Sequence, residues 1–441
     1  MGNDPLVFLE TFQLNYMLKN LALFVTTLFL MLVLGEWLFP KILGKLPLRL
    51  YGSIDKNLRI LAQSSKKSTL PHEYIAIVGD SYAVGAGDWL EQVRGTSFLG
   101  SPSYSPAHLI NEKTGIDVVS FGQGGVGSFS GIWKEPITQF LYINSVKNYR
   151  LSPPKYFLIF FYEGNDVYDN AGFLRKKLLS IKKGSLKNKI ESNGVTTPLN
   201  REFQKALDGD YSRSFWKNML FTRSLSQGIS NLVKEFAFPN KNLPFYFSFP
   251  KTPISLGLIN DEKTPLPMHL LGPPLFGVKE SDRELAQARK LTNQIEEFHI
   301  TKGEYKLGLF IFEQALAMLA GFFPQTDIKV IFIPSPLSSY RLVSQKVSSR
   351  GYMEFKNIEE VAVIKRRHAE LCEAIRKISV VRKVSFLNTT KSLRRVASQE
   401  FIHGPTDWDH FNRRGYEALS TDIAHVFLQS GGGARTDNCI Y

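Results

Sequence analysis

A serine near the start of the chain and a histidine near its end have neighbours that suit nucleophilic catalysis. Ser81 follows Gly79 and Asp80 directly after an apolar run, and His410 follows Asp407 by three residues. A carboxylate can hold an imidazole in one tautomer, and the imidazole can then take the proton of a serine hydroxyl that attacks an ester carbonyl. We therefore interpret Ser81 as a candidate nucleophile and His410 as its candidate base.

Each of these residues also has a simpler interpretation. A Gly-Asp-Ser segment is often only a turn with a helix N-cap, and a lone histidine usually has a structural role. Asp409 competes with Asp407 as the partner of His410, because both precede the histidine closely.

Two other segments could bring hydrogen-bond donors to a reacting oxygen. The segment Ser120–Gly127 is rich in glycine, which lets a backbone approach a substrate and aim N–H groups at it. Asn165, in Glu163–Asp166, could donate its side-chain amide, although an Asn-Asp turn is the simpler interpretation.

The glycine-rich segment also satisfies G-x-G-x-x-G, the fingerprint of dinucleotide-binding folds, through Gly122, Gly124 and Gly127. That fingerprint needs an acidic residue some ~20 positions further on, at the end of the next strand. The region Phe140–Tyr149 supplies none, so we discount a nucleotide. Serine chemistry requires neither a cofactor nor a metal.

The candidate residues lie at the ends of short apolar runs that alternate with helical stretches. Such runs are typical of parallel strands covered on both faces, whose carboxyl ends share one edge where ligands bind. The fold class is therefore predicted to be α/β with a parallel sheet. The five predicted strands are Tyr74–Val78, Ile116–Ser120, Tyr156–Tyr162, Ile328–Ile333 and Lys383–Leu387.

Four segments, in this order and at these strand ends, together resemble the blocks of the SGNH (GDSL) hydrolase superfamily. Ser120 departs from the pattern, because many members carry asparagine there. The four segments are Gly79-Asp80-Ser81 with Gly85, the glycines up to Gly125, Gly164-Asn165-Asp166, and Asp407-Trp408-Asp409-His410 with Asn412 and Gly415-Tyr416.

The resemblance implies a fold and a set of roles. The fold is a three-layer αβα arrangement around a flavodoxin-like, five-stranded parallel sheet. Ser81, Asp407 and His410 would form a catalytic triad, with Asp407 preferred over Asp409 because the family spacing is Asp-x-x-His. The Ser81 and Gly125 amides and the Asn165 side chain would form the oxyanion hole.

The function implied is that of a serine esterase acting on small O-acyl esters of carbohydrate, as in polysaccharide O-acetyl modification. Transfer of the acyl group to a sugar hydroxyl would use the same residues. An esterase for lipids or lysophospholipids is an alternative. A membrane-tethered glycan-binding protein without catalysis is another, but a binding module does not need a triad.

The N-terminal region contains an uncharged apolar run, Leu21–Gly35. With its flanks, from Met17 to Phe39, it reaches the ~20 residues of a bilayer-spanning helix. Asp4 and Glu10 precede the run and no small-x-small site follows it, which favours an uncleaved anchor over a signal peptide. The basic residues after it point to a cytoplasmic catalytic side, whereas the resemblance favours the extracytoplasmic side.

The rest of the chain divides by composition. We expect an N-terminal segment with the transmembrane helix at 1–40, a basic connector at 41–72, the hydrolase domain at 73–428 and a flexible tail at 429–441. An insertion of about 169–302 contains the basic stretch Arg175–Lys189 and the alternating Phe245, Phe247 and Phe249. It is predicted to be a lid or substrate subdomain. The apolar segment Tyr305–Phe323 is predicted to be a buried helix rather than a second span.

The charge and the cysteine content limit which classes of partner and which cysteine sites are expected. The 441 residues carry a formal charge of +14, which allows an acidic glycan or anionic lipid as partner. Nucleic acid is not expected, because only the charge and the basic stretch favour it. The two cysteines, Cys372 and Cys439, predict neither a disulfide framework nor a zinc site. The oligomeric state is left open.

Overall fold

The structure is a computed structural model of the chain, in which most of the α/β core is described. Asp407 and Asp409, the basic stretch Arg175–Lys189 and the alternating phenylalanines at 245–249 lie outside the described residues. The described residues are 5–45, 54, 56–63, 65–87, 105–147, 149–174, 193–209, 211, 215–237, 276–277, 302–340, 346–350, 356–403, 410–429 and 436–439.

All five predicted strands are present and form one sheet. Its strands are β1 (Ile75–Val78), β2 (Val118–Ser120), β3 (Tyr156–Tyr162), β5 (Asp327–Ile333) and β8 (Ser385–Asn388). Every pairing is parallel, and the spatial order is β2-β1-β3-β5-β8. The α/β class with a five-stranded parallel sheet is confirmed.

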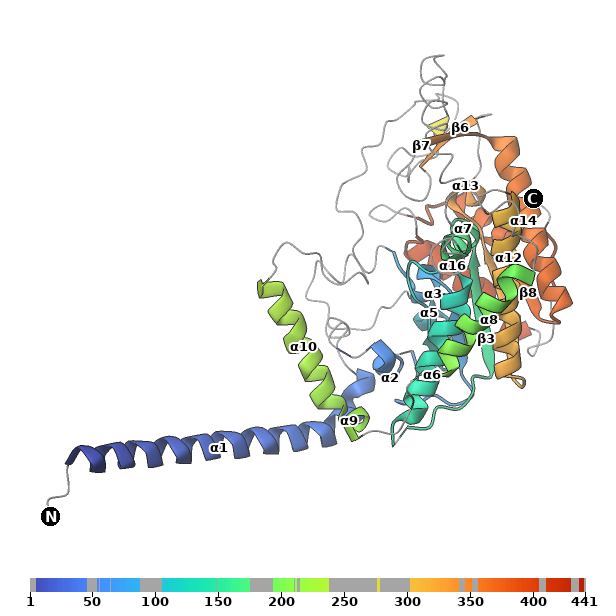
Figure 1. Ribbon diagram of the computed structural model, residues 1–441. Helices are drawn as coiled ribbons and strands as arrows, with labels where there is room; N and C mark the ends of the chain where they lie inside the picture. The colour runs from blue at the N-terminus through green and yellow to red at the C-terminus, as the bar shows by residue number, and fades with distance from the viewer. Residues whose placement is uncertain are drawn as a thin grey trace.

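Side chains of the strands alternate between two apolar cores, one on each face of the sheet. Phe157, Ile159 and Phe161 belong to one core, whereas Leu158 and Phe160 belong to the other. Because both faces are apolar, helices cover both, and Figure 1 shows the sheet between them. The first core includes α6 (Glu135–Ser145), α12 (Lys302–Phe322) and α14 (Val361–Val381), and the second includes α5 (Pro106–Thr114) and α16 (Arg413–Gln429).

The helix α12 contains nearly all of the apolar segment Tyr305–Phe323, which was considered as a second membrane span. It is long and apolar enough to cross a bilayer. However, Ile311, Phe312, Ala315 and Leu316 are fully buried in the first core. The prediction of a buried helix is confirmed.

Shorter elements complete the described part of the chain. A small antiparallel sheet, which the sequence did not indicate, joins β4 (Phe276–Gly277), β6 (Lys346–Arg350) and β7 (Lys356–Glu360). The remaining helices are α2 (Arg59–Ala62), α3 (Ser81–Val84), α7 (Asp166–Phe173), α8 (Asn193–Leu207), α9 (Phe215–Asn218), α10 (Leu220–Ala237), α13 (Pro336–Ser339) and α15 (Thr390–Ala397), with the short turns η1 (Leu43–Lys45), η3 (Lys56–Leu58) and η4 (Phe129–Lys134).

The segment predicted as a basic connector packs against the edge of the sheet. Leu58 and Leu61 are fully buried in the first core. The Gln63 side chain accepts a hydrogen bond from the Ser120 N–H at 2.8 Å and donates to the Ser120 carbonyl at 2.6 Å. Ser65 bonds Val118 in the same way through its carbonyl and hydroxyl. These bonds satisfy groups of β2, the edge strand, that a sheet edge otherwise leaves unpaired.

The N-terminal helix α1 (Pro5–Ile42) projects away from the body of the molecule (Figure 1). From Tyr16 to Ile42 it is long and apolar enough to be a membrane span or a signal sequence. Large apolar side chains along this stretch are exposed, among them Phe24, Phe29 and Met31 at 63–64%.

The prediction about the cysteines is wrong, because Cys372 and Cys439 form a disulfide. They are 67 residues apart in sequence, but the fold brings their Cα atoms to 5.7 Å. Thr436 forms a parallel bridge with Phe386 of β8, and the Asp437 N–H donates to the Phe386 carbonyl. Residues 436–439 therefore lie along the outer edge of the sheet, where the sequence suggested a frayed tail.

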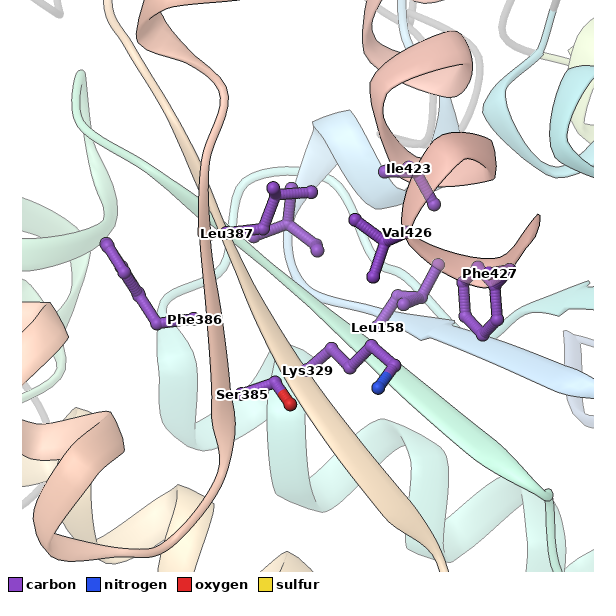
Figure 2. A pocket seen from close by; sticks show the side chains of 9 residues that line it. Leu158, Lys329, Ser385, Phe386, Leu387, Ile423, Val426 and Phe427 are labelled. Atoms are coloured by element: carbon purple, nitrogen blue, oxygen red, sulfur yellow. The ribbon is translucent and has the colours of Figure 1, made fainter. Parts of the chain in front are cut away.

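A small apolar cavity lies between the sheet and α16 (Figure 2). It is near the amino ends of β5 and β8, so it is separate from the strand ends that carry the candidate catalytic residues. Its lining is Leu158, Lys329, Ile331, Ser385, Phe386, Leu387, Ile423, Val426 and Phe427.

Candidate active site

Ser81 is the first residue of α3, immediately beyond the carboxyl end of β1. Asp80 caps this short helix, and its Oδ1 accepts the Tyr82 N–H at 2.9 Å. Gly79 makes the sharp turn with φ +140°, and a Cβ at this position would lie 2.7 Å from the Phe160 carbonyl oxygen. The Gly-Asp-Ser segment is therefore a capped turn that also aims the serine at the strand ends.

The structure brings His410 to Ser81 from 329 residues further along the chain. The Nε2 atom of His410 lies 2.8 Å from the Ser81 hydroxyl oxygen, a hydrogen-bonding distance. The Tyr82 ring packs beside the imidazole, with 5.4 Å between ring centroids. The other possible acceptor of the serine proton, Asp80 Oδ2, is further away at 3.4 Å.

Contacts around α16 fix the position of His410. The hydroxyl of Tyr416 donates to the Ala86 carbonyl at 2.5 Å, which ties the start of α16 to the loop after α3. Asn412 donates its N–H to Ile402 and its side-chain amide to Phe401. Asp407 and Asp409 lie outside the described residues, so the partner of the second imidazole nitrogen stays a prediction.

The glycine-rich segment passes directly beside the nucleophile. A Cβ on Gly124 would lie 3.8 Å from the Cβ of Ser81, and Gly125 has the left-handed φ of +69°. Both glycines are exposed, so their backbone can be reached by a substrate. Their place beside Ser81 is compatible with an oxyanion role for this loop, and the assignment of Gly125 as the donor stays a prediction.

The other glycines of the G-x-G-x-x-G pattern have packing roles. A Cβ on Gly122 would lie 2.6 Å from Ala83, and one on Gly127 would overlap Asn170. Ser120, which departs from the family pattern, donates to the Ala83 carbonyl at 2.6 Å and accepts the Gly122 N–H at 3.2 Å. The segment is therefore shaped to pack against α3.

Asn170 is a positioning residue that the sequence did not single out. Its side chain is fully buried on α7. Its oxygen accepts the Ser128 N–H at 2.7 Å, and its amide donates to the Ser128 hydroxyl and the Gly308 carbonyl. These bonds attach the end of the glycine-rich segment to α7 and α12. Only the folded chain brings these groups together, so no local pattern could reveal them.

Asn165 lies at the carboxyl end of β3 and is buried. Its side chain hydrogen bonds Asp80, the residue that precedes the nucleophile. Its Oδ1 has no hydrogen-bond partner among the described residues. An asparagine amide has two N–H donors, so one can bind Asp80 while the other is directed at a substrate oxygen.

Two buried carboxyl groups lie under the site. Burial raises the pKa of Asp80, although the Tyr82 N–H, His410, Asn165 and Ser81 oppose the shift. Burial and the nearby Asp80 charge hold the pKa of Asp166 well above its usual range. The Asp166 carboxyl group accepts one backbone hydrogen bond, from the Tyr162 N–H at 2.8 Å.

A second polar network, at the end of the same strand, was also missed by sequence reasoning. Glu163 Oε2 lies 2.9 Å from His368 Nδ1 and accepts the Ser335 N–H at 2.9 Å. Its Oε1 accepts the Ser338 hydroxyl at 2.9 Å. Burial alone would raise the pKa of Glu163, but His368 and these donors lower it below the usual value. His368 comes from α14, which no local pattern connects to β3.

Searches of known protein families, of characterised proteins and of solved structures find no match to this chain.

Proposed function

We propose that the chain is a serine esterase or acyltransferase of the SGNH/GDSL kind. The observation that carries the proposal is the 2.8 Å contact between the Ser81 hydroxyl and His410 Nε2. It occurs at the carboxyl edge of a parallel sheet, where α/β folds bind ligands. The strand order of the sheet is also the flavodoxin-like order that this superfamily implies.

The residues suggest a two-step reaction. His410 takes the Ser81 proton, and the serine oxygen attacks the ester carbonyl to form a tetrahedral oxyanion. Backbone N–H groups at Ser81 and Gly125 and the amide of Asn165 would stabilise that oxyanion. Collapse releases the alcohol, which takes the proton from His410, and leaves an acyl-enzyme. Water or a sugar hydroxyl then attacks the acyl-enzyme while His410 takes its proton. The ester bond to Ser81 breaks as His410 returns that proton to the serine oxygen, which releases the acid or the acylated sugar. Asp407 is the proposed partner of the imidazolium.

The position of the site favours a carbohydrate ester over a bilayer lipid. The last turns of α1 pack against α10, and Asn218, the last residue of the preceding helix α9, accepts the Lys147 N–H in the segment between α6 and the amino end of β3. Ser81 and Asn165 lie at the opposite, carboxyl edge. A seven-residue strand separates the two edges by about 20 Å. A substrate that extends away from the bilayer fits this separation better than a lipid held within it.

The disulfide favours the extracytoplasmic side of the membrane for the domain. Disulfides persist in oxidising compartments and are rare in the cytosol. The Cys372–Cys439 bond joins α14 to the C-terminal residues along β8, within the hydrolase-like body. The disulfide is a stronger indicator of sidedness than the basic residues after α1, because large domains translocate with little regard to flanking charge.

Labelling with a fluorophosphonate probe tests the proposal. The full-length protein should be labelled. Ser81→Ala should abolish labelling, while Ser130→Ala, which replaces a half-buried serine of η4, should retain it. Absence of labelling in the folded wild-type protein would refute the enzyme and favour a glycan-binding protein. A series of p-nitrophenyl esters from acetyl to long-chain, with and without a sugar acceptor, then separates the substrates. A preference for long chains would refute the carbohydrate assignment.

A further inference from the structure

The helix α10 is attached to the end of α1 by specific contacts. The Glu36 carboxylate accepts the N–H groups of Phe221 at 3.1 Å and Thr222 at 2.8 Å, which are in the first turn of α10. The Phe221 ring covers Gly35, where any Cβ would overlap it, and meets the Phe39 ring edge-on at 5.8 Å. These contacts hold the start of α10 within the apolar stretch Tyr16–Ile42 of α1.

An apolar stripe continues along α10 from this junction. Leu225, Ile229 and Val233 follow Phe221 at intervals of four residues, so they share one side of the helix. They are 42%, 52% and 59% exposed, with exposure rising away from α1. Among the described residues outside α1, the only other exposed large apolar side chains are Val380 and Val381.

The other side of α10 faces the body of the protein near the junction. Arg223 hydrogen bonds the hydroxyl of Tyr142 on α6, and its guanidinium lies 5.3 Å from the Tyr142 ring centroid. Ser224 is buried. The beginning of the helix is therefore held between α1 and α6, while the stripe is left uncovered by the described residues.

We propose that α10 lies in the interface of the bilayer that α1 crosses, with Leu225, Ile229 and Val233 directed into the lipid. This inference rests on the proposed membrane anchor. The exposed apolar surface of α1 continues through Phe221 into the stripe of α10, so lipid that surrounds α1 at the junction also reaches the stripe. Interfacial helices bury such a face just below the lipid headgroups. Figure 1 shows α10 meeting the end of α1 at the junction and rising steeply away from it, so that the two helices diverge.

Two contact points with the membrane would restrict how the domain is oriented. A domain that is tethered by one helix and a linker can tilt and rotate relative to the bilayer. If α1 crosses the bilayer and α10 lies in its interface, both movements are restricted. Because α10 is fixed to α6 through Arg223, the carboxyl edge that carries Ser81 would keep a constant height above the bilayer. The interfacial helix thus serves to present the site to a substrate outside the membrane.

Spin-label accessibility in full-length protein reconstituted into phospholipid nanodiscs tests the inference. The native cysteines are joined in a disulfide, so a single introduced cysteine can be labelled selectively. Ile229→Cys probes the stripe, and Gln227→Cys, two residues away and nearly opposite on the helix, is the matched control. Leu28→Cys reports on α1 itself. The measurement is the collision rate with oxygen, which enters lipid, relative to that with a neutral nickel chelate, which does not.

The expected result is an oxygen-to-nickel ratio several-fold higher at residue 229 than at residue 227, and similar to that at residue 28. A ratio at 229 as low as at 227, with residue 28 in lipid, would overturn the interfacial helix while leaving the anchor intact. Low collision rates with both reagents at 229 would show that protein covers the stripe and would also overturn it. A low oxygen-to-nickel ratio at residue 28 would show that α1 does not span the membrane. It would refute this inference but would not bear on the esterase proposal.

Discussion

Two buried carboxyl groups three residues apart at the end of β3 have opposite electrostatic surroundings. Glu163 faces His368 and accepts bonds from Ser335 and Ser338, and its pKa is lowered although burial opposes this. Asp166 accepts one backbone bond and faces the carboxyl group of Asp80, and its pKa is raised well above the usual range.

The difference separates a structural network from the candidate active site. Around Glu163, each carboxylate oxygen has a donor, and the network joins β3 to α13 and α14. Around Asp80 and Asp166, the cost of burial is only partly offset by hydrogen bonds. Asp80 lies next to the Ser81–His410 pair, and Asp166 interacts with Asp80. Groups with perturbed pKa values are often found at active sites, because hydrogen bonds and opposite charges there do not fully offset the cost of burying a charge. Substitutions in the two regions should therefore affect different observables.

The largest effect is expected for His410→Ala. It removes the only base within 3 Å of the Ser81 hydroxyl among the described residues, so kcat/KM should fall by at least about 10³-fold. His410 is half-buried at the edge of the site, so the free energy of unfolding should change little. Ester hydrolysis and urea unfolding of the same preparation measure both. Retention of activity would contradict the assignment of the base.

The second largest effect is expected for Glu163→Ala, and it concerns stability. The change leaves His368, which is 2% exposed, without its carboxylate, and breaking a buried pair typically costs about 3–5 kcal/mol. Urea unfolding measures the loss. Glu163→Gln, which keeps the shape and an acceptor, should lose less. If Glu163→Ala removes activity as completely as His410→Ala but leaves stability unchanged, the division into two regions is wrong.

Asn165→Ala should reduce kcat by about 10²-fold with little change in KM, because an oxyanion donor acts mainly in the transition state. Asn144→Ala, which removes a half-buried asparagine on α6, is the matched control and should leave kcat unchanged. Steady-state kinetics with a p-nitrophenyl ester make the comparison. A rise in KM alone would mean that Asn165 binds the ground state instead.

The smallest effect is a dependence of stability on pH, with opposite signs for the two carboxyl groups. The raised pKa of Asp166 means that the folded protein binds this proton more tightly, so acidification stabilises it as the pH falls through the raised pKa towards 3.8. The lowered pKa of Glu163 means that its contribution is present above pH 4.5 and is lost as the pH falls below that value. Each contributes at most about 1.4 kcal/mol per pH unit.

Urea unfolding between about pH 2.5 and pH 7 can separate these two contributions. Asp166→Asn should lose the gain in stability on acidification, whereas Glu163→Gln should lose the steep decline at the acid end. Identical pH profiles for wild type and both variants would show that neither group changes its pKa on folding.

The sequence alone determined the sheet, because each strand is a local run of apolar residues with helical stretches between. It also identified Ser81 and His410 as candidates, since the neighbours that mark them, Gly79-Asp80 and Asp407-Trp408-Asp409, are adjacent to them in the chain. Local patterns of this kind need no knowledge of the fold.

Tertiary structure decided everything that depends on pairs distant in sequence. The distance between Ser81 and His410, the Glu163–His368 pair, the bonds of Asn170 to the glycine-rich segment and the disulfide all join segments more than 40 residues apart. The hydrogen bonds of Gln63 and Ser65 to β2, and the contact between Glu36 and α10, could not be predicted from the sequence either. Hydrogen bonds and disulfides act over a few ångströms, so only the folded chain determines which groups can form them.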